Sequence, residues 1–402
     1  MSDSVKNRPK TLFFFTDAFP LGWAEHYIEK EIGYLCAAFD SVYIFPLGVS
    51  DGAPRTIPAN ASFVDLHATA DFSKANIPKT FVKDVRLVME ANRVDEQGFV
   101  SLFKTLFNAR VYSRAIESFM KERSLQSEDV VCYSYWFYQW SLIVALLKHD
   151  GIVERAVSRV HFADLYQYVK KTPFAQFKLR ALDKSILISQ HGYAYFQKRH
   201  PALVDKFEVG YLGVEQHELE AVPSETSAKI IVTCSTIRPQ KRVDLIAKCI
   251  SQLKQNIRWV HYGTGPNDFV DQLKTIANSF PENIEFDFRG WAKNEEVIAF
   301  YKGNQVSLFV NLSTHEGVPV SIMEATSFGV PVLATDVFGT GEALSPKECV
   351  LLPVDSEESE IIRVMNQMLD KKPDRNEVAE FSRSRFDAAK NYPEFIQRHL
   401  QP

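Results

Sequence analysis

The sequence predicts an α/β fold with two domains, each built on a doubly wound parallel sheet. The first observation is length, since 402 residues are too many for one ordinary hydrophobic core. The second is the regular alternation of short apolar runs with amphipathic segments of helical spacing, which is typical of β–α units. The third is that runs such as 11–15 and 306–312 are apolar without strict alternation, as strands buried on both faces of a parallel sheet are.

The N-terminal half supplies the first set of alternating elements. Its expected strands lie at 11–15, 41–45, 62–66, 130–133, 159–161, 185–189 and 207–211. Its expected helices lie at 24–38, within 79–123, after the aromatic run 135–138 and after 192. The polar, acidic segment 215–228 contains one proline and is the expected linker between the domains.

The C-terminal half repeats the alternation. Its expected strands lie at 229–234, 257–261, 284–288, 306–312, 331–335 and 350–352. Helices are expected to begin near 242, 267, 295, 319 and 342, and two more are expected over 357–370 and 375–400.

Composition excludes several classes of protein. The 46% hydrophobic and 12% aromatic content supports filled cores and argues against a disordered chain. The net charge of −4 gives no general attraction to nucleic acid, so no nucleic-acid partner is expected. The five cysteines are scattered and lack metal-ligand spacing, which is typical of a reducing compartment. The sequence shows no signal-peptide pattern and no apolar run near the ~20 residues of a membrane span. Together these observations indicate a cytoplasmic protein.

Residues 79–123 combine nine lysines or arginines with six acidic residues and interleaved aromatic side chains. One interpretation is an amphipathic helix pair whose charged face is solvated. The other is a surface that contacts anionic lipid or a lipid-linked substrate, which would bring the protein to the inner face of the cell membrane.

The segment 306–336 predicts a strand, a polar turn, a helix and a second strand. Pro319 stands at the expected start of the helix and Gly329 just past its end. Free N–H groups and the helix dipole favour an anion at this N-terminus, while Glu324, about one turn in, suits a neutral hydroxyl pair such as a ribose diol. The alternative is that Glu316 caps the helix and Glu324 is a surface charge.

A second pattern is the pair Lys241–Arg242, which stands where a helix begins after the strand at 229–234. The helix dipole does not favour cations at that end. Two adjacent cations there call for an anionic partner, and a diphosphate fits. The alternative is an ordinary pair of surface charges.

Two weaker signals lie at other predicted strand ends. Gly263 and Gly265 form a G-x-G fragment, but Asp268 replaces the third glycine of the dinucleotide fingerprint. We interpret the fragment as a tight turn that lets the backbone approach a ligand. His161 lies at a strand end in the N-terminal half, where open α/β sheets place ligands, although a lone histidine is more often structural.

Together these residues resemble the retaining GT-B glycosyltransferases of glycosyltransferase family four, the group 1 glycosyltransferases. The resemblance is strongest over 229–343. It is carried there by Cys234-Ser235 with Lys241-Arg242, Gly263-x-Gly265-Pro266, Phe288-Arg289-Gly290, the segment 313–325 with Glu316 and Glu324, and Phe338-Gly339-Thr340-Gly341-Glu342. The N-terminal half matches more loosely, through Phe19-Pro20-Leu21-Gly22 with Glu25, Arg159-x-His161 with Asp164, and Leu212-Gly213.

The resemblance implies two Rossmann-like domains facing across a cleft. It implies an acceptor-binding domain at 1–214, a donor-binding domain at 215–383 and a C-terminal helix at 384–402 that crosses back to the first domain. The implied reaction moves a sugar from a nucleoside-diphosphate sugar to a hydroxyl of a glycan or lipid-linked glycan, with retention, in polysaccharide or glycoconjugate biosynthesis. No cofactor or divalent metal is expected, since basic residues and the helix dipole stabilise the leaving phosphate and the sequence has no D-x-D motif.

The same resemblance implies the site residues. Catalytic roles fall to Lys241, which neutralises the diphosphate, to Glu316, which touches the donor sugar, and to His161, which approaches that sugar from the other domain. Donor contacts are expected from Gly22, Arg242, Gly263, Gly290, Gly317, Val318, Pro319, Val320 and Glu324, and acceptor-side contacts from Glu25 and Asp164.

Three departures from the family pattern stand out. Thr236 occupies the position, five residues before the loop lysine, where many relatives carry an arginine, so Arg238 or Arg242 would supply the second positive charge. The glycine-rich N-terminal loop is reduced to 22–25, and Phe338 stands where glycine is common, which narrows the site.

The alternatives to a glycosyltransferase are a nucleotide-sugar epimerase or phosphorylase-like enzyme on the same scaffold, a non-catalytic interaction subunit, and a nicotinamide dehydrogenase.

Overall fold

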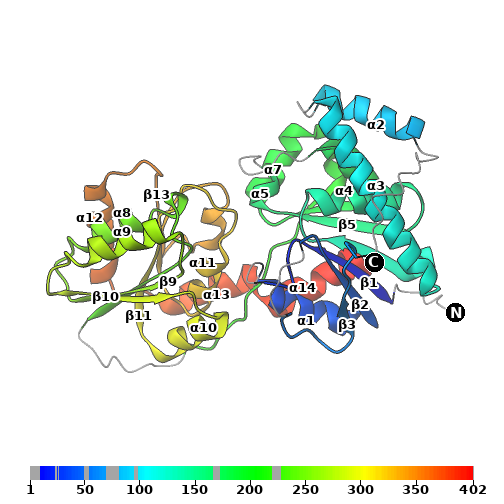
Figure 1. The fold of residues 1–402 in the computed structure, drawn as a ribbon. Helices are drawn as coiled ribbons and strands as arrows, with labels where there is room; N and C mark the ends of the chain where they lie inside the picture. The colour runs from blue at the N-terminus through cyan, green and yellow to red at the C-terminus, as the bar shows by residue number, and fades with distance from the viewer. Residues whose placement is uncertain are drawn as a thin grey trace. The chain divides into compact units, whose positions relative to one another are not determined.

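The computed structural model describes residues 10–22, 25, 27–48, 54–68, 81–94, 98–165, 173–219 and 228–401. Parts of the expected linker (220–227) and of the basic segment (79–80 and 95–97) lie outside these residues. The chain forms two compact units (Figure 1). The first comprises 1–210 with 392–402 and the second 211–391, whereas the resemblance sets the limits at 214 and 383.

A seven-stranded parallel sheet is the centre of the first unit. Its strands are β1 (Thr11–Thr16), β2 (Ser41–Pro46), β3 (Ala61–Phe63), β4 (Val130–Ser134), β5 (Arg155–Val160), β6 (Lys184–Leu187) and β7 (Phe207–Val209). They lie in the order β3-β2-β1-β4-β5-β6-β7. Each strand predicted in this half is present, with its limits shifted by a few residues.

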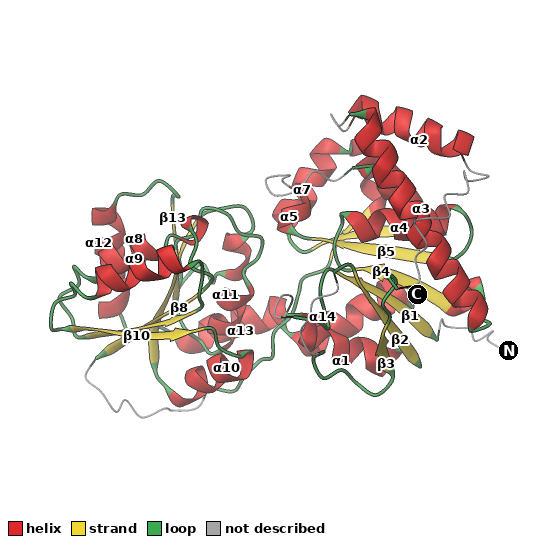
Figure 2. Ribbon diagram, in the orientation of Figure 1, coloured by secondary structure: helices red, strands yellow, loops and turns green. Residues whose placement is uncertain are grey.

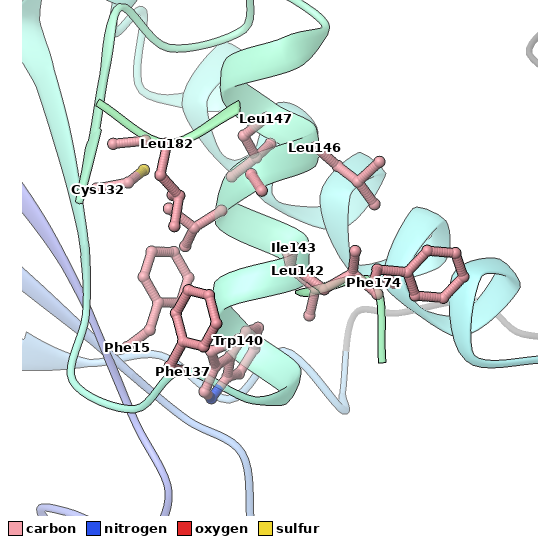
Figure 3. Packing of buried hydrophobic residues seen from close by; sticks show 14 of the residues in the cluster. Phe15, Cys132, Phe137, Trp140, Leu142, Ile143, Leu146, Leu147, Phe174 and Leu182 are labelled. Carbon is pink, nitrogen blue, oxygen red and sulfur yellow. The ribbon is translucent and has the colours of Figure 1, made fainter. Parts of the chain in front are cut away.

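Helices cover both faces of this sheet (Figure 2). They are α1 (Ile28–Ala38), α2 (Phe81–Val94), α3 (Phe99–Glu122), α4 (Gln139–His149), α5 (Phe162–Leu165), α6 (Ala175–Ala181) and α7 (Gln190–Arg199). Because side chains alternate along a strand, Phe13 and Phe15 of β1 enter the cluster with α3 and α4, while Leu12 and Phe14 enter the cluster with α1. Figure 3 shows the first cluster, in which Trp140 of α4 packs on Phe15 with ring centroids 5.0 Å apart.

A buried ion pair joins α1 to the sheet. Arg159 of β5 and Glu31 of α1 are almost inaccessible to solvent, and Nη2 lies 3.1 Å from Oε1. Tyr133 accepts from Arg159 Nε at 2.8 Å and donates to Glu31 at 2.9 Å. The guanidinium also lies over the ring of Phe395 at 4.2 Å, at the end of α14 (Ala388–Phe395). This network therefore fixes the returning C-terminal segment within the first unit.

The second unit is built on a six-stranded parallel sheet. Its strands are β8 (Lys229–Cys234), β9 (Ile257–Tyr262), β10 (Ile284–Gly290), β11 (Val306–Asn311), β12 (Val332–Thr335) and β13 (Val350–Leu352). They lie in the order β10-β9-β8-β11-β12-β13, which is that of a Rossmann fold. Its helices are α8 (Val243–Ile250), α9 (Asn267–Ala277), α10 (Asn294–Gly303), α11 (Val320–Ser327), α12 (Glu358–Asp370) and α13 (Arg375–Phe386). The predicted doubly wound α/β class is confirmed for both units.

Two predicted helices differ from the structure. The helix expected over 375–400 is divided into α13, α14 and a π-helical turn at Ile396–Leu400. It is interrupted at Asp387, which forms a parallel bridge with Val214. The helix expected near 342 is a single 3-10 turn, Thr340–Ala343. Among the helices of the described residues, none is both long and apolar enough to cross a bilayer.

Replacing Glu31 with alanine should strongly destabilise the first unit. The change leaves Arg159 buried and unpaired, which costs about 3–5 kcal/mol of unfolding free energy. The matched control is Glu29→Ala on the same helix, because Glu29 pairs with Arg55 while its side chain is 39% exposed, and we expect a loss of at most about 1 kcal/mol. Urea denaturation followed by circular dichroism measures both losses, and equal losses would contradict the role of the buried pair.

Candidate active site

The carboxyl ends of β8 and β11 mark the place where a ligand is expected in the second unit. These strands are neighbours, and the order of strands along the chain reverses between them. Open α/β sheets bind ligands outside the carboxyl ends of their strands at such a switch point. The loop 235–242, with Lys241, follows β8, and the loop 312–319, with Glu316, follows β11.

Two of the predicted catalytic side chains meet at this switch point. Lys241 Nζ donates to Glu316 Oε1 at 2.5 Å. Ser313 Oγ, at 2.7 Å, and Asn311 Nδ2, at 3.3 Å, donate to the same oxygen. In the part of the chain that the structure describes, the hydrogen bonds to this carboxylate all end on Oε1. Oε2 therefore keeps its capacity to accept a hydrogen bond from a ligand.

The N-terminus of α11 follows this turn and is not capped by a side chain. Pro319 occupies the N-cap position and makes no side-chain cap bond. The alternative in which Glu316 caps the helix is therefore wrong. The N–H groups of Ile322 and Met323 donate to the Pro319 carbonyl, whereas those of Val320 and Ser321 have no partner within the helix. With the helix dipole, these two groups favour an anion.

Glu324 is held in the interior of the site. It is only 6% exposed, so the alternative of a surface charge is wrong. Its Oε1 accepts from Asn294 Nδ2, at the start of α10, at 2.6 Å. Burial, and then the Glu324 charge, raise the pKa of Cys234 to about 12. The carboxylate thus lies next to the end of β8, within the same switch point as Lys241.

Arg242 serves the protein's own backbone. It adopts a left-handed conformation with φ 47°. Its Nε donates to the Leu312 carbonyl at 2.5 Å and its Nη1 to the Val354 carbonyl at 2.7 Å. Arg238 is exposed, and no hydrogen bond or ion pair of its side chain occurs among the described residues. Arg238 is therefore available to a phosphate, and Arg242 Nη2 is buried without a partner among the described residues.

The glycines of the G-x-G fragment are required by packing inside the second unit. A Cβ on Gly263, whose φ is 131°, would lie 1.9 Å from the Ser235 carbonyl oxygen. A Cβ on Gly265 would lie 2.1 Å from that of Ile237. The backbone at these two glycines therefore lies close to the protein's own loop that carries Lys241. The sequence pattern predicts a close approach to a ligand.

Two further predicted positions have left-handed backbones. Gly290 has φ 65° at the end of β10, and a Cβ there would meet nothing within 4 Å. Phe338 has φ 48° and stacks on His315 with ring centroids 5.9 Å apart. Its ring therefore covers the turn that precedes α11.

The first unit has a switch point of its own, between β1 and β4. Gly22 and Glu25 follow β1, and His161 and Asp164 follow β5, which is the next strand beyond β4. Gly22, with φ 65°, accepts two bonds from Arg55 at its carbonyl. The four predicted residues of this half thus lie in the segments that follow the carboxyl ends of β1 and β5, with Asp164 in α5.

Glu25 is fully occupied within the first unit. Its Oε1 accepts from the Asp17 N–H at 3.1 Å and from Trp136 Nε1 at 2.5 Å. Its Oε2 accepts from the N–H groups of Ala18 and Phe19, both at 2.7 Å. The resemblance implies that Glu25 contacts the acceptor substrate. Such a contact would therefore be made by Trp136, whose indole N–H is bonded to Glu25.

His161 and Asp164 are buried and each keeps one unsatisfied atom. Asp164 Oδ2 accepts from the His161 N–H at 2.8 Å. His161 Nε2 and Asp164 Oδ1 are buried without a partner among the described residues. Burial lowers the pKa of His161 well below its usual value, helped by Arg159, and burial raises the pKa of Asp164 to about 7. The imidazole is therefore neutral near pH 7, and a hydrogen bond to the Tyr135 backbone leaves Nε2 as an acceptor.

Sequence reasoning missed three residues that hold these sites. Asn311 and Asn294 orient the two glutamates from a strand end and a helix start, and such amides carry no motif. Trp136 belongs to the aromatic run 135–138, directly after a strand. Its position beside the switch point of the first sheet could have singled it out.

Comparison with known proteins connects the second unit to a family. Residues 215–385 match the family model described as Glycosyl transferases group 1. A search of curated proteins found no match.

Solved structures resemble nearly the whole chain. The apo form of the lipopolysaccharide outer core galactosyltransferase WaaB is 16% identical, with 96% of this chain and 99% of that chain covered and a TM-score of 0.65. Anabaena Alr3699/HepE in complex with UDP is 15% identical, with 97% and 99% covered and a TM-score of 0.68. Sucrose-phosphate synthase from Thermosynechococcus elongatus is 13% identical, with 96% and 98% covered and a TM-score of 0.68. These likenesses confirm the predicted GT-B fold with its two Rossmann-like units.

Replacing Glu324 with alanine should weaken the binding of a nucleoside diphosphate. If the buried carboxylate accepts the two ribose hydroxyls, the loss is about 1.5–3 kcal/mol, or at least roughly tenfold in affinity. Calorimetric titration with UDP and GDP measures it. Glu285→Ala is the control, because that side chain is 68% exposed in the same unit. An unchanged affinity in Glu324→Ala would contradict the ribose role.

Proposed function

We infer that this chain, whose residues 215–385 match the group 1 glycosyltransferase family model, transfers a sugar from a nucleoside-diphosphate sugar to an acceptor hydroxyl. The observation that carries the proposal is the pair Lys241–Glu316 beside the uncapped N-terminus of α11, at the switch point of the second sheet. Two of the similar structures of HepE are complexes with UDP and with UDP-glucose, which supports the same class of donor here. The proposed acceptor is a glycan or lipid-linked glycan of polysaccharide or glycoconjugate biosynthesis.

The donor is proposed to bind through its diphosphate and its ribose. The diphosphate meets the N–H groups of Val320 and Ser321, and Lys241 turns from Glu316 to the phosphate oxygens. Arg238, which is exposed in the same loop, adds the second positive charge. Glu324 accepts the ribose hydroxyl pair. Apart from the turn of the Lys241 side chain, these groups are proposed to keep their positions when the donor binds.

The proposed reaction retains the anomeric configuration without a protein nucleophile. The acceptor oxygen forms its bond to the anomeric carbon on the face from which the diphosphate leaves. The bond between the anomeric carbon and the phosphate oxygen breaks at the same time. The released phosphate oxygen takes the proton of the acceptor hydroxyl. Glu316 Oε2 accepts a hydroxyl of the donor sugar, so the protein mainly positions and neutralises.

Lys241→Ala should lower the rate of sugar transfer by roughly 10²–10³, equivalent to about 2.7–4 kcal/mol in the barrier, because one preorganised donor to the leaving phosphate is lost. The assay is nucleoside-diphosphate release from the donor that a thermal-shift screen of UDP-, GDP- and ADP-sugars identifies. Lys248→Ala, in the adjacent helix α8, is the control, since its side chain is 48% exposed. A rate within twofold of the wild type would contradict the assigned role of Lys241.

Transfer activity should survive EDTA. In the proposed mechanism the positive charge at the leaving phosphate comes from Lys241, Arg238 and the N-terminus of α11. The same release assay, run with and without chelator, checks this. Complete loss of activity with rescue by Mn²⁺ would point to a different mechanism.

We further propose that the first unit contacts an anionic membrane surface through residues 79–123. Lys83, Arg86 and Met89 of α2 are exposed, as are Phe99 and Val100 at the start of α3. Exposed cations beside apolar side chains favour the interface of anionic lipid. Flotation with liposomes of phosphatidylglycerol should carry the protein upward at low salt and less so at high salt. Equal behaviour with purely zwitterionic liposomes would count against this contact.

A further inference from the structure

One buried hydroxyl group in the second unit has no part in the site described above. Tyr301 lies on α10 and is 3% exposed, and its hydroxyl oxygen is buried without a hydrogen-bond partner among the described residues. Folded proteins pair nearly all such groups, because an unpaired buried hydroxyl destabilises the fold. A hydroxyl that is unpaired in the free protein therefore calls for a partner in another state of the protein.

Two contacts between α10 and α11 place this tyrosine in relation to the site. Asn294, at the start of α10, donates to Glu324 Oε1 on α11 at 2.6 Å. Two turns later the Tyr301 ring stacks on Phe328, at the end of α11, with ring centroids 5.3 Å apart and an interplanar angle of 16°. Residues seven apart in a helix share a face, as do residues four apart. Both contacts therefore use one face of each helix.

The Tyr301 hydroxyl extends from this face toward Glu324. Side chains on a helix lean toward its N-terminus, so the hydroxyl reaches from its own turn toward the turn of Asn294. Burial raises the pKa of Tyr301 well above its usual value, and Cys234, at the end of β8, and Glu324 raise it further. Both groups are thus close enough to influence the hydroxyl. The phenol keeps its proton near pH 7 and can donate a hydrogen bond.

The proposed ribose contact of Glu324 supplies the missing partner. An ionised carboxylate can accept about four hydrogen bonds, so it can bind the ribose diol together with donors from the protein. When the diol donates to both oxygens, their other acceptor positions point back toward α10. Asn294 already donates from that helix, and Tyr301 stands on the same face. The proposed change is a rotation of the carboxylate about its Cγ–Cδ bond, which leaves Glu324 in its place.

We propose that the Tyr301 hydroxyl donates a hydrogen bond to Glu324 in the nucleotide-bound protein and thereby positions this carboxylate for the ribose. Tyr301 is a positioning residue that acts through Glu324. Because its hydroxyl is unpaired in the free protein and paired in the complex, it lowers the stability of the free protein and strengthens nucleotide binding. This inference rests on the proposed function and adds a residue to its donor site.

The test is Tyr301→Phe, which removes the hydroxyl and keeps the ring. Calorimetric titration with UDP, GDP and ADP first identifies the nucleotide that the wild type binds most tightly. The variant should bind this nucleotide about tenfold more weakly, because a hydrogen bond to a charged group is lost. The 2′,3′-dideoxy form lacks the hydroxyls that orient Glu324, so wild type and variant should bind it equally well. Without nucleotide, the Tm of Tyr301→Phe should be at least that of the wild type.

Two further variants serve as controls. Tyr211→Phe removes a hydroxyl that donates to Glu342 Oε2 at 2.7 Å in the free protein. It should therefore lower the Tm and leave the nucleotide affinity unchanged. The double variant Tyr301→Phe/Glu324→Ala should bind the nucleotide as weakly as Glu324→Ala and no more weakly, because the hydroxyl acts through that carboxylate.

The outcomes separate this inference from the proposed function. If the wild type binds none of UDP, GDP and ADP, the proposed function fails and the role of Tyr301 fails with it. If the wild type binds one of them, an unchanged affinity in Tyr301→Phe or a lower Tm of that variant without nucleotide overturns the role of Tyr301 alone. Equal losses for the ribose and dideoxy forms, or a loss in the double variant beyond that of Glu324→Ala, would also overturn it.

Discussion

The ion pair between Lys241 and Glu316 holds together the two loops on which the second unit's site depends. The pair is partly buried, with side-chain exposures of 26% and 12%, so its attraction is screened less than that of a surface pair. Ser313 and Asn311 donate to the same Glu316 oxygen. If Lys241 turns to a phosphate, Glu316 therefore keeps two neutral donors and its place. Binding of a charged leaving group then requires only that the Lys241 side chain change its partner.

The backbone around this ion pair is constrained from two other directions. Gly263 and Gly265 let the turn after β9 pack directly against the loop 235–242. Arg242 ties the same loop to the Leu312 carbonyl after β11. A rigid loop keeps the lysine within reach of both its carboxylate and the helix N-terminus, which is the positioning that transfer chemistry requires. Substitutions at either glycine would disturb the site without touching a ligand.

Local sequence patterns predicted the alternation of strands and helices because burial on both faces leaves an unmistakable apolar signature. Lys241 could be selected because the helix dipole does not favour a cation at a helix start, and Glu316 and Glu324 could be selected through the resemblance to a known family. The hydrogen bond from Arg242 to the Leu312 carbonyl could not be predicted, since Leu312 lies 70 residues away in the sequence. The break at Asp387 depends on Val214, which is still more distant in the sequence. The engagement of Glu25 with Trp136 likewise exists only once β1 and β4 are neighbours. Contacts of this kind arise from topology, which no local pattern contains.

A crystal structure of the protein with a bound nucleoside diphosphate tests the roles of Lys241 and of the α11 N-terminus most directly. We expect phosphate oxygens within hydrogen-bond distance of the N–H groups of Val320 and Ser321 and of Lys241 Nζ, with Lys241 released from Glu316. A diphosphate bound instead at the N-terminus of α9, beyond Gly263 and Gly265, with the ion pair intact, would contradict it.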